Sequence, residues 1–534
     1  MTNGKTSEDN VGGPTRRDVL KAAGWATSVV AASIPASPAR SEPSKVAATD
    51  LTAREAVDRI RKGEMSAEAY VTDLLKQHDA HKDLNAFITL DENRVKQEAR
   101  AVDQARARGD KLGPLAGLPF VVKDQIDVTG YPTTVGSTVL KGYVAKKNAV
   151  VIDTMVKAGA VVMAKTNMSD LITGGRYYPA ARNPYDLSRT TGGSSTGVGA
   201  ALGARIAPAG IGEDTAGSVR WPAANCGIAG LRPSTFAFDN YFNGTDKKRY
   251  SGLGMVLPTG WMDTMGPMAR TVSDVAFLDG VITGEKLPAV ALRSAKVGIP
   301  RADYWEKRPH DPAVKKAIDT AIAKLKDAGL QTVEIDLNAL IELSARDRLG
   351  PMVTKGAKPT AEWLAENQPL VTAKDIEAER AKNGFSTEPR NYFRIPAGSQ
   401  ARPHVTPAEE MAIMKDAWAK YSGAFKDNGI VALASPTMMM IPQYLNLNWN
   451  PRDQKIKVGG QWVEEWDLIL TNIWWGSRFG APALSLPAGM ADGMPVGMQL
   501  QGMPGADTQI LALGIEAEKV LGSLPPPTFK HVPI

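Results

Sequence analysis

The chain has 534 residues, of which 43% are hydrophobic and 22% charged, and its 63 basic and 57 acidic side chains leave a net charge of +6. This composition excludes a disordered chain, because disorder goes with fewer apolar residues, and so small a charge over this length argues against nucleic-acid binding. The single cysteine, Cys226, excludes an intramolecular disulfide framework and a multi-cysteine zinc site, and its small apolar neighbours predict a buried core residue.

The first 39 residues carry an export pattern. Arg16-Arg17 precede a mildly apolar stretch over 22–35, and Ser37-Pro38-Ala39 offers small residues for cleavage. The pattern resembles a twin-arginine signal, and its apolar stretch is shorter than the roughly 20 residues that span a bilayer. We therefore expect a signal peptide over 1–39 and a catalytic domain over 40–534, which the twin-arginine machinery delivers to the periplasm or the medium. A short amphipathic helix with two surface arginines is the alternative interpretation.

Helix and strand patterns then alternate along the chain. Thr52 and Glu55 form a capping-box pattern before an apolar helical stretch that Gly63 ends, and a second helix is predicted after Ser66. The alternation predicts an α/β sheet with helices on its faces. The next predicted elements are a strand over 86–90, a helix over 92–106, a strand over 119–122 leading into Lys123, a helix over 150–157 and a strand over 161–164.

Residues 346–450 interrupt this alternation. They are polar and broken by prolines, so we expect an irregular or helical insertion there, although strand-like patterns occur within it at 430–434 and beyond it at 483–486. No later segment has an apolar run of transmembrane length, so no stable membrane anchor is expected.

Two glycine-rich segments that contain serine are the strongest chemical signal. The first reads Thr190-Thr191-Gly192-Gly193-Ser194-Ser195-Thr196-Gly197, and the second reads Gly212-Glu213-Asp214-Thr215-Ala216-Gly217-Ser218-Val219-Arg220. Together they resemble the core motif of the amidase signature family of serine hydrolases. The resemblance covers residues 52–520 and is weakest in the middle insertion. Further segments match in the same order: 117–119 before Lys123-Asp124, 164–167, 182–184, 222–227, 230–233, 266–270 and 480–487.

This resemblance implies the large mixed β-sheet flanked by helices on both faces that is typical of the family, and a hydrolase of carboxylic amides. It implies Ser218 as the nucleophile, Ser194 as a bridging serine on a cis peptide bond after Gly193, and Lys123 as the base. The two serines are 24 residues apart, which is the family's spacing. An acyl-enzyme would form, ammonia or an amine would leave, and water would release the carboxylate. This chemistry requires neither a cofactor nor a metal.

The residues themselves support such chemistry. A serine hydroxyl is a weak nucleophile unless an adjacent base accepts its proton. Lysine is a base only when it is neutral, and burial can lower a lysine pKa by up to about 3–5 units. Lys123 follows the apolar run 119–122, which predicts that it is buried.

The loop around the nucleophile supplies the other implied groups. Each backbone N–H aimed at the oxyanion is typically worth about 2.7–4 kcal/mol in the transition state. Ala216 and Thr196 stand where the family usually has glycine, so we expect a slightly different loop or substrate pocket. For Asp214 and Arg220, a solvated surface pair is the alternative interpretation. The resemblance implies an oxyanion hole from Thr215, Ala216, Gly217 and Ser218, with Ser195, Asp214 and Arg220 in support.

Substrate and partners are less constrained. Five aromatic residues fall in segments that we expect to border the site, and they suggest an apolar or aryl acyl group, with core packing as the alternative. They are Tyr177, Tyr178, Phe242, Trp474 and Trp475.

The sequence also admits other functions. A tRNA-dependent amidotransferase subunit is the main alternative within the family, and the export signal argues against it. Ester or carbamate hydrolysis and the oligomeric state, a homodimer included, stay open. The five histidines lie far in sequence from the serine motifs, which disfavours a histidine triad.

Overall fold

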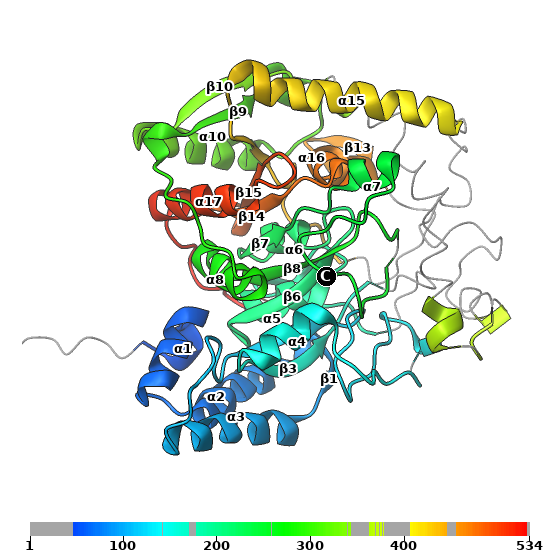
Figure 1. Ribbon diagram of the computed structural model, residues 1–534. Helices are drawn as coiled ribbons and strands as arrows, with labels where there is room; N and C mark the ends of the chain where they lie inside the picture. The colour runs from blue at the N-terminus through cyan, green and yellow to red at the C-terminus, as the bar shows by residue number, and fades with distance from the viewer. Residues whose placement is uncertain are drawn as a thin grey trace, which may run out of the picture. The chain divides into compact units, whose positions relative to one another are not determined.

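A mixed sheet of 11 strands forms the centre of the computed structural model, in the order β1-β3-β2-β6-β8-β7-β14-β15-β11-β9-β10 (Figure 1). The predicted fold class is therefore confirmed. The strands are β1 (Phe87–Leu90), β2 (Pro119–Lys123), β3 (Val161–Thr166), β6 (Ala209–Asp214), β7 (Ala229–Arg232), β8 (Thr264–Ala269), β9 (Lys296–Pro300), β10 (Gln331–Ile335), β11 (Ala432–Pro436), β14 (Ala483–Ala491) and β15 (Met494–Gln501). The structure describes residues 46–140, 142–169, 178–257, 259–338, 340–342, 363–368, 370–372, 374–375, 378, 406–445 and 455–530.

Parallel and antiparallel pairs form separate groups in this sheet. Strand β2 runs parallel to both β3 and β6, and β9 runs parallel to both β10 and β11. Antiparallel strands β8, β7, β14 and β15 join these two parallel groups. Two short hairpin pairs lie outside the sheet: β4 (Arg182–Asn183) with β5 (Asp186–Thr190), and β12 (Lys455–Val458) with β13 (Gln461–Glu464).

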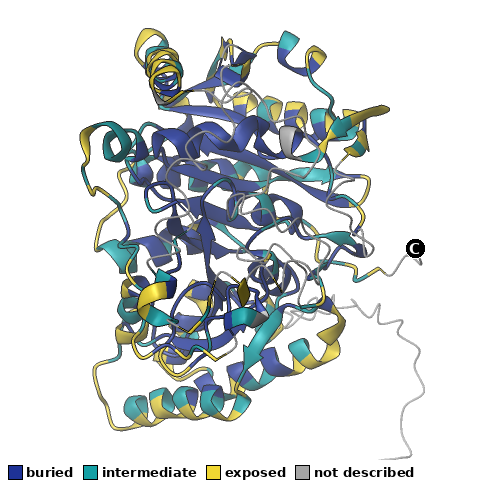
Figure 2. Cartoon of the chain, turned by 90° about the vertical axis from the view of Figure 1, so that its right-hand side faces the viewer, coloured by how far each residue is buried: buried dark blue, intermediate teal, exposed yellow. Residues whose placement is uncertain are grey.

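Helices cover both faces of the sheet, and buried strands lie between them (Figures 1 and 2). Strand β2 shows why, because its successive side chains point to opposite faces of the sheet. Phe120 and Val122 pack in a cluster with side chains of α4 and α8, whereas Val121 packs in a cluster with α2, α3 and α5. The described helices are α1 (Ala53–Lys62), α2 (Ala67–Ala80), α3 (Glu92–Ala107), α4 (Val150–Lys157), α5 (Thr196–Gly203), α6 (Arg220–Asn225), α7 (Ala237–Asn243), α8 (Val272–Thr283), α9 (Asp303–Glu306), α10 (Pro312–Asp327), α15 (Pro407–Asn428), α16 (Glu465–Phe479) and α17 (Asp507–Leu521).

The predicted early elements are present with their expected ends. The Thr52 side chain accepts a hydrogen bond from the Glu55 N–H, and the Glu55 carboxylate accepts one from the Thr52 N–H, which completes a capping box at the start of α1. Gly63 ends α1 with a φ of 76°, a left-handed conformation that glycine adopts without steric cost. Ser66 caps α2, and Cys226 is buried, as predicted.

Within 346–450, the described residues 406–445 are less irregular than their composition suggests. Strand β11 lies in the central sheet, antiparallel to β15, so this part of the range is not an insertion. Helix α15 buries Met414, Ala417, Tyr421 and Phe425, which recur at helical spacing, and it contacts β9. Charged, small and aromatic residues are mixed at the positions between these four, which made the segment look irregular.

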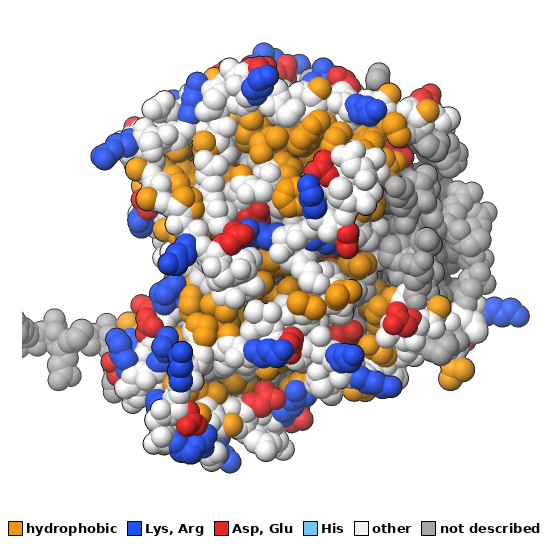
Figure 3. Space-filling model, in the orientation of Figure 1, with side chains coloured by type: hydrophobic (Ala, Val, Ile, Leu, Met, Phe, Trp, Pro, Cys, Tyr) orange, Lys and Arg blue, Asp and Glu red, His pale blue; other side chains and the backbone are white. Residues whose placement is uncertain are grey.

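Two further properties concern the apolar character of the helices and the charge on the surface. Within the described part of the chain, no helix combines the length and apolar character that crossing a bilayer requires. On the face shown in Figure 3, Lys and Arg side chains lie interspersed with Asp and Glu side chains.

Candidate active site

The site lies where two neighbouring strands end. Strands β2 and β6 are parallel and adjacent, with Val121 opposite Gly210 and Val122 opposite Ile211. Their carboxyl ends therefore meet at one edge of the sheet, where α/β proteins commonly bind ligands. Lys123 is the last residue of β2, and helix α5, which contacts both strands, follows directly on Ser194 and Ser195.

Lys123 is fully buried and has three polar neighbours. Its Nζ lies 2.7 Å from Ser194 Oγ, 2.7 Å from Glu213 Oε2 and 3.3 Å from the Glu213 carbonyl oxygen. Burial lowers the pKa of Lys123, and this effect outweighs the neighbouring Glu213 carboxyl group, which acts in the opposite direction. The site therefore favours the neutral amine more than water does.

The two predicted serines lie on adjoining backbone segments. The Gly193–Ser194 peptide bond is cis, and Ser194 is 8% exposed. The Ser195 N–H donates to the Ser218 carbonyl oxygen at 3.3 Å, and Ser195 Oγ lies within hydrogen-bond distance of the Glu213 backbone N–H and carbonyl. Although both serines lie in the described part of the chain, no hydrogen bond joins Ser194 Oγ to Ser218 Oγ there.

Asp214 fixes the loop that carries Ser218. Arg220 donates to both Asp214 carboxylate oxygens at 3.0 and 3.1 Å, and Arg232 donates to Oδ1 at 3.1 Å. Burial alone would raise the pKa of Asp214, but the two guanidinium groups outweigh it and hold that pKa well below its usual range. All three side chains are fully buried, so the alternative of a solvated surface pair is wrong.

The same carboxylate uses one of the four backbone donors expected in the oxyanion hole. The Gly217 N–H donates to Asp214 Oδ1 at 2.8 Å. The N–H groups of Thr215, Ala216 and Ser218 make no hydrogen bond to any other residue that the structure describes. These three are therefore the donors that remain open to a ligand.

Comparison with known proteins bears on what this arrangement does. The profile of the Amidase family matches residues 69–511 of the chain.

The chain belongs to the amidase signature family.

The enzyme's relatives and structural neighbours are amide-processing proteins. Mandelamide hydrolase of Pseudomonas putida is 31% identical over 90% of this chain and 94% of its own length. A glutamyl-tRNA(Gln) amidotransferase subunit of Symbiobacterium thermophilum is 31% identical over 86% of this chain and 94% of its own length. A crystal structure of an amidase aligns with a TM-score of 0.71 and 28% identity, and covers 88% of this chain and all of the other. The chain is therefore an amidase, a hydrolase of amide bonds.

Helix α16 packs directly against the loop that carries Ser218. A Cβ atom at Gly217 would lie 2.0 Å from Ile473 Cδ1, and Gly217 has a φ of 98°, so only glycine fits there. Arg220 also donates to the Ile473 carbonyl oxygen at 3.0 Å. Ile473 thus lies against both the loop and the residue that fixes it.

The aromatic residues predicted near the substrate are dispersed. Tyr177 lies outside the described residues, and Tyr178 is half-buried. Trp474 and Trp475 are 1% and 6% exposed and belong to the main core cluster, as the packing alternative predicts. Phe242 is partly buried in α7, with its ring centroid 4.5 Å from that of Phe238. Substrate contact by these residues stays a prediction.

Trp221 is the aromatic residue that the structure does place beside the serine loop. A Cβ atom at Gly192 would lie 2.8 Å from the Trp221 ring, and one at Gly193 would lie 3.8 Å from it. The side chain is half-buried. Its position three residues after Ser218 was the available sequence signal.

The sequence interpretation assigned no role to three further residues of the site. Glu213 contacts Lys123, Arg232 contacts Asp214, and Asp263 shares the Thr215 hydroxyl group with Glu213. Glu213 had a signal, since it is an acid that directly follows the apolar segment 209–212 within one strand. Asp263 and Arg232 reach the site because β8 pairs with β6, and β7 pairs with β8.

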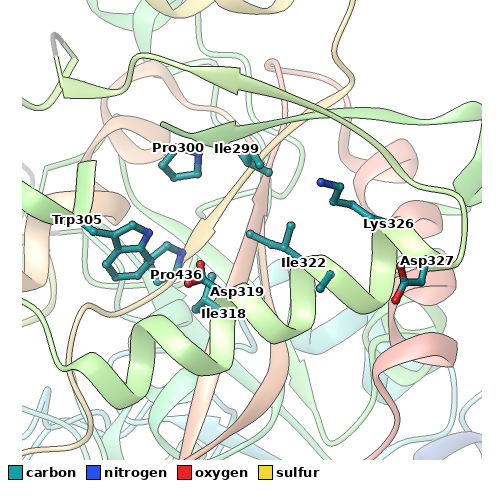
Figure 4. Close-up of a pocket in the computed structure, with 10 residues that line it drawn as sticks. Ile299, Pro300, Trp305, Ile318, Asp319, Ile322, Lys326, Asp327 and Pro436 are labelled. Carbon is teal, nitrogen blue, oxygen red and sulfur yellow. The ribbon is translucent and has the colours of Figure 1, made fainter. Parts of the chain in front are cut away.

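A separate cavity lies away from this chemistry. It has a volume of about 280 Å³ and lies between α10 and β9, with Ile299, Trp305 and Ile322 among the side chains that line it (Figure 4). Among the described residues that line it, none was predicted to act in catalysis.

Proposed function

We propose that the enzyme hydrolyses carboxylic amides with a Lys123–Ser194–Ser218 triad, through an acyl-enzyme on Ser218. The observation that carries this proposal is the 2.7 Å contact between Lys123 Nζ and Ser194 Oγ, made by a lysine with no solvent exposure. A buried amine whose pKa is lowered and which contacts a serine hydroxyl has the properties of a general base.

In acylation, Ser218 Oγ attacks the amide carbonyl carbon while its proton moves to Ser194 Oγ and the Ser194 proton moves to Lys123 Nζ. This step requires the Ser218 hydroxyl group to approach Ser194 Oγ when substrate binds. The open N–H groups of Thr215, Ala216 and Ser218 supply hydrogen bonds for the oxyanion.

The tetrahedral intermediate then collapses. The C–N bond breaks as the proton on Lys123 returns through Ser194 to the leaving nitrogen, and ammonia or an amine departs. Water attacks the Ser218 ester while its proton passes to Lys123, and the acyl–Oγ bond then breaks as that proton returns through Ser194 to Ser218 Oγ. The product leaves as the carboxylic acid, which ionises to the carboxylate in water. The lysine ends neutral, so each turnover restores the base.

An apolar or aryl acyl group is the substrate class that we propose. Trp221 offers an aromatic surface beside the serine loop, and the half-buried Ala216 adds apolar surface near Ser218. A relative named for mandelamide, an amide whose acyl group bears an aromatic ring, supports the same class.

Fluorophosphonate labelling followed by peptide mapping tests the nucleophile. The proposal predicts one labelled residue, Ser218, and loss of both label and amidase activity in Ser218→Ala. A panel of aryl, aliphatic and peptide C-terminal amides, with the matching esters and carbamates, tests the substrate class. Label on another serine of the active enzyme would exclude this triad.

A glutamine-dependent amidotransferase subunit is the second candidate function, because several relatives carry that name. It would use the same residues to release ammonia from glutamine. Glutaminase activity that exceeds the activity on aryl amides would favour it, whereas aryl amide hydrolysis without glutaminase activity would favour the free-standing amidase.

We also propose that residues 1–39 direct export and that the mature enzyme acts in the periplasm or outside the cell. The Arg16-Arg17 pair and the small residues at 37–39 support this proposal. A charged tRNA substrate is cytoplasmic, so export would also disfavour the amidotransferase alternative.

A further inference from the structure

Lys123 has a second partner that the proposed triad does not use. Glu213 is 1% exposed, and its Oε2 lies 2.7 Å from Lys123 Nζ. The other oxygen, Oε1, lies 2.5 Å from Thr215 Oγ1, which is also 2.8 Å from Asp263 Oδ1. A chain of four polar groups therefore runs from Lys123 through Glu213 and Thr215 to Asp263.

The Thr215 hydroxyl group contacts two carboxyl groups but has a single hydrogen. It can donate to one of them, and towards the other it presents only a lone pair. An ionised carboxylate accepts hydrogen bonds and donates none, so the second contact requires a proton on one of the two acids. One of Glu213 and Asp263 is therefore neutral.

Asp263 has the partners of an ionised carboxylate. Its Oδ2 accepts from the Thr259 and Gly260 N–H groups at 2.8 and 2.7 Å, and its Oδ1 accepts from Thr259 Oγ1 at 2.8 Å. With Thr215 as the fourth donor, all four lone-pair positions of the carboxylate are used, and none is left for a proton. The proton therefore belongs to Glu213.

We propose that Glu213 is a protonated positioning residue, which donates from Oε1 to Thr215 and orients the neutral Lys123 amine through Oε2. This inference rests on the proposed triad, since it assigns the group that sets the state of its base. A neutral amine has two N–H donors and one lone pair. The two donors match Glu213 Oε2 and the Glu213 carbonyl oxygen, which leaves the lone pair directed at Ser194.

The surrounding charges agree with this assignment. Asp263 faces Glu213 from the loop before β8, and Asp214 adjoins it on β6, but Asp214 is matched by Arg220 and Arg232. Burial raises the pKa of Glu213, and Asp263 raises it further, while Lys123 lowers it. An ionised Glu213 would raise the pKa of Lys123 and keep the amine charged, whereas the neutral acid does not.

The reaction leaves the Glu213 proton in place. Lys123 receives the serine proton and becomes an ammonium group, still held by Glu213 Oε2, and then returns that proton to the leaving nitrogen. Glu213 acts through Lys123 and touches no reacting atom.

The test compares wild type with Glu213→Gln and Glu213→Leu in the pH dependence of kcat/KM on one amide, which reports groups of the free enzyme. Glutamine reproduces the proposed pattern, with an NH₂ donor towards Thr215 and a carbonyl oxygen towards Lys123. We expect E213Q to lose about tenfold or less in kcat/KM, with its acidic limb at the same pH, and E213L to lose about a hundredfold or more, as for loss of a general base.

If Glu213 is ionised, its removal takes an opposite charge away from Lys123 and lowers the pKa of that lysine by about 1–3 units. An acidic limb that moves to lower pH by this amount in E213Q would therefore overturn the inference. Infrared difference spectra give a second readout. Wild type minus E213Q should show the carbonyl band of a protonated carboxyl group, and Thr215→Val, which removes its hydrogen-bond acceptor, should shift that band.

Absence of the band, or a band that T215V leaves unmoved, would also overturn the inference. Fluorophosphonate labelling of wild-type Ser218 separates the two proposals. If Ser218 is labelled but the E213Q limb moves, only the Glu213 assignment fails, whereas absence of label on Ser218 counts against the triad itself.

Discussion

Lys123 Nζ and Ser194 Oγ lie 2.7 Å apart although 71 residues separate them in the chain. The contact exists because β2 ends at Lys123, and because α5 begins just beyond Ser194 against both β2 and β6. The fold thus encloses an amine with a lowered pKa next to the hydroxyl group that the proposed mechanism requires it to deprotonate.

Replacing Lys123 by methionine tests the base. We expect Lys123→Met to fold, because a side chain of similar length fills the buried space, and to lose about 10²–10⁴-fold in kcat, the typical contribution of general-base catalysis. Lys165→Met is the matched control. Lys165 is equally buried on the adjacent strand β3, but its Nζ donates to Pro132 O and Thr133 Oγ1 instead of the serines. Lys165→Met should lower the thermal stability of the protein, but a fluorophosphonate should still label Ser218 in the folded variant.

The proposed bridging role of Ser194 predicts that the effect of its removal depends on the leaving group. An amine leaving group requires a proton to depart, whereas a nitrophenolate does not. Ser194→Ala should therefore lose more activity on a nitroanilide than on the nitrophenyl ester with the same acyl group. The two substrates are compared by kcat/KM in the same preparation, and equal losses on both would contradict proton return through Ser194.

Removal of the Asp214 charge should strongly reduce the stability of the protein. Asp214→Asn leaves Arg220 and Arg232 buried without a matching charge, which costs about 3–5 kcal/mol of unfolding free energy. The exposed pair Asp153–Lys157, with carboxylate and amine 2.6 Å apart, is the control, and Asp153→Asn should change stability by about 0–1 kcal/mol. Urea denaturation at neutral pH measures both, and similar values for the two variants would contradict the role of Asp214.

The same carboxylate gives the wild type a stability that depends on pH. Its pKa in the folded chain lies below the unfolded value of about 3.9, so its contribution is present above that pH and is lost as the pH falls towards the folded pKa. Unfolding free energy measured between neutral and acidic pH should fall less steeply in D214N. Parallel curves for the two proteins would show that other carboxylates dominate acid unfolding.

The export proposal has an independent test. Replacing Arg16 and Arg17 by lysines preserves charge but removes the paired arginines, so the precursor should stay in the cytoplasm. Fractionation and immunoblotting of cells that express both forms measure the outcome. Unchanged export of the double-lysine form would contradict the twin-arginine interpretation.

Local patterns explain what the sequence could predict. The capping box at Thr52, the strand that ends at Lys123 and the two serine motifs each depend on residues close together in the chain. They could be predicted because hydrophobic periodicity and helix caps are local signals. The contact between Lys123 and Ser194 followed only from the family resemblance, since local patterns do not define which strands pair.

Pairing between distant segments explains what was missed. Asp263 lies near Glu213 because β8 pairs antiparallel with β6, where Thr264 is opposite Asp214. Strand β11 belongs to the central sheet because it pairs with β15, for example Leu433 with Gln501 and Pro436 with Met498, which lie far apart in the chain. The Gly217 N–H was expected to bind an oxyanion, but Asp214 accepts from it, a loop conformation that composition does not reveal.

The rate at which a fluorophosphonate labels Ser218, measured across pH, is the sharpest test of whether Lys123 is the base. If Lys123 is the base, the rate should rise with pH as one group loses a proton, at a midpoint below the usual range for lysine. This pH-dependent component should vanish in Lys123→Met. The same midpoint and amplitude in Lys123→Met would contradict this assignment, because another group would then be removing the serine proton.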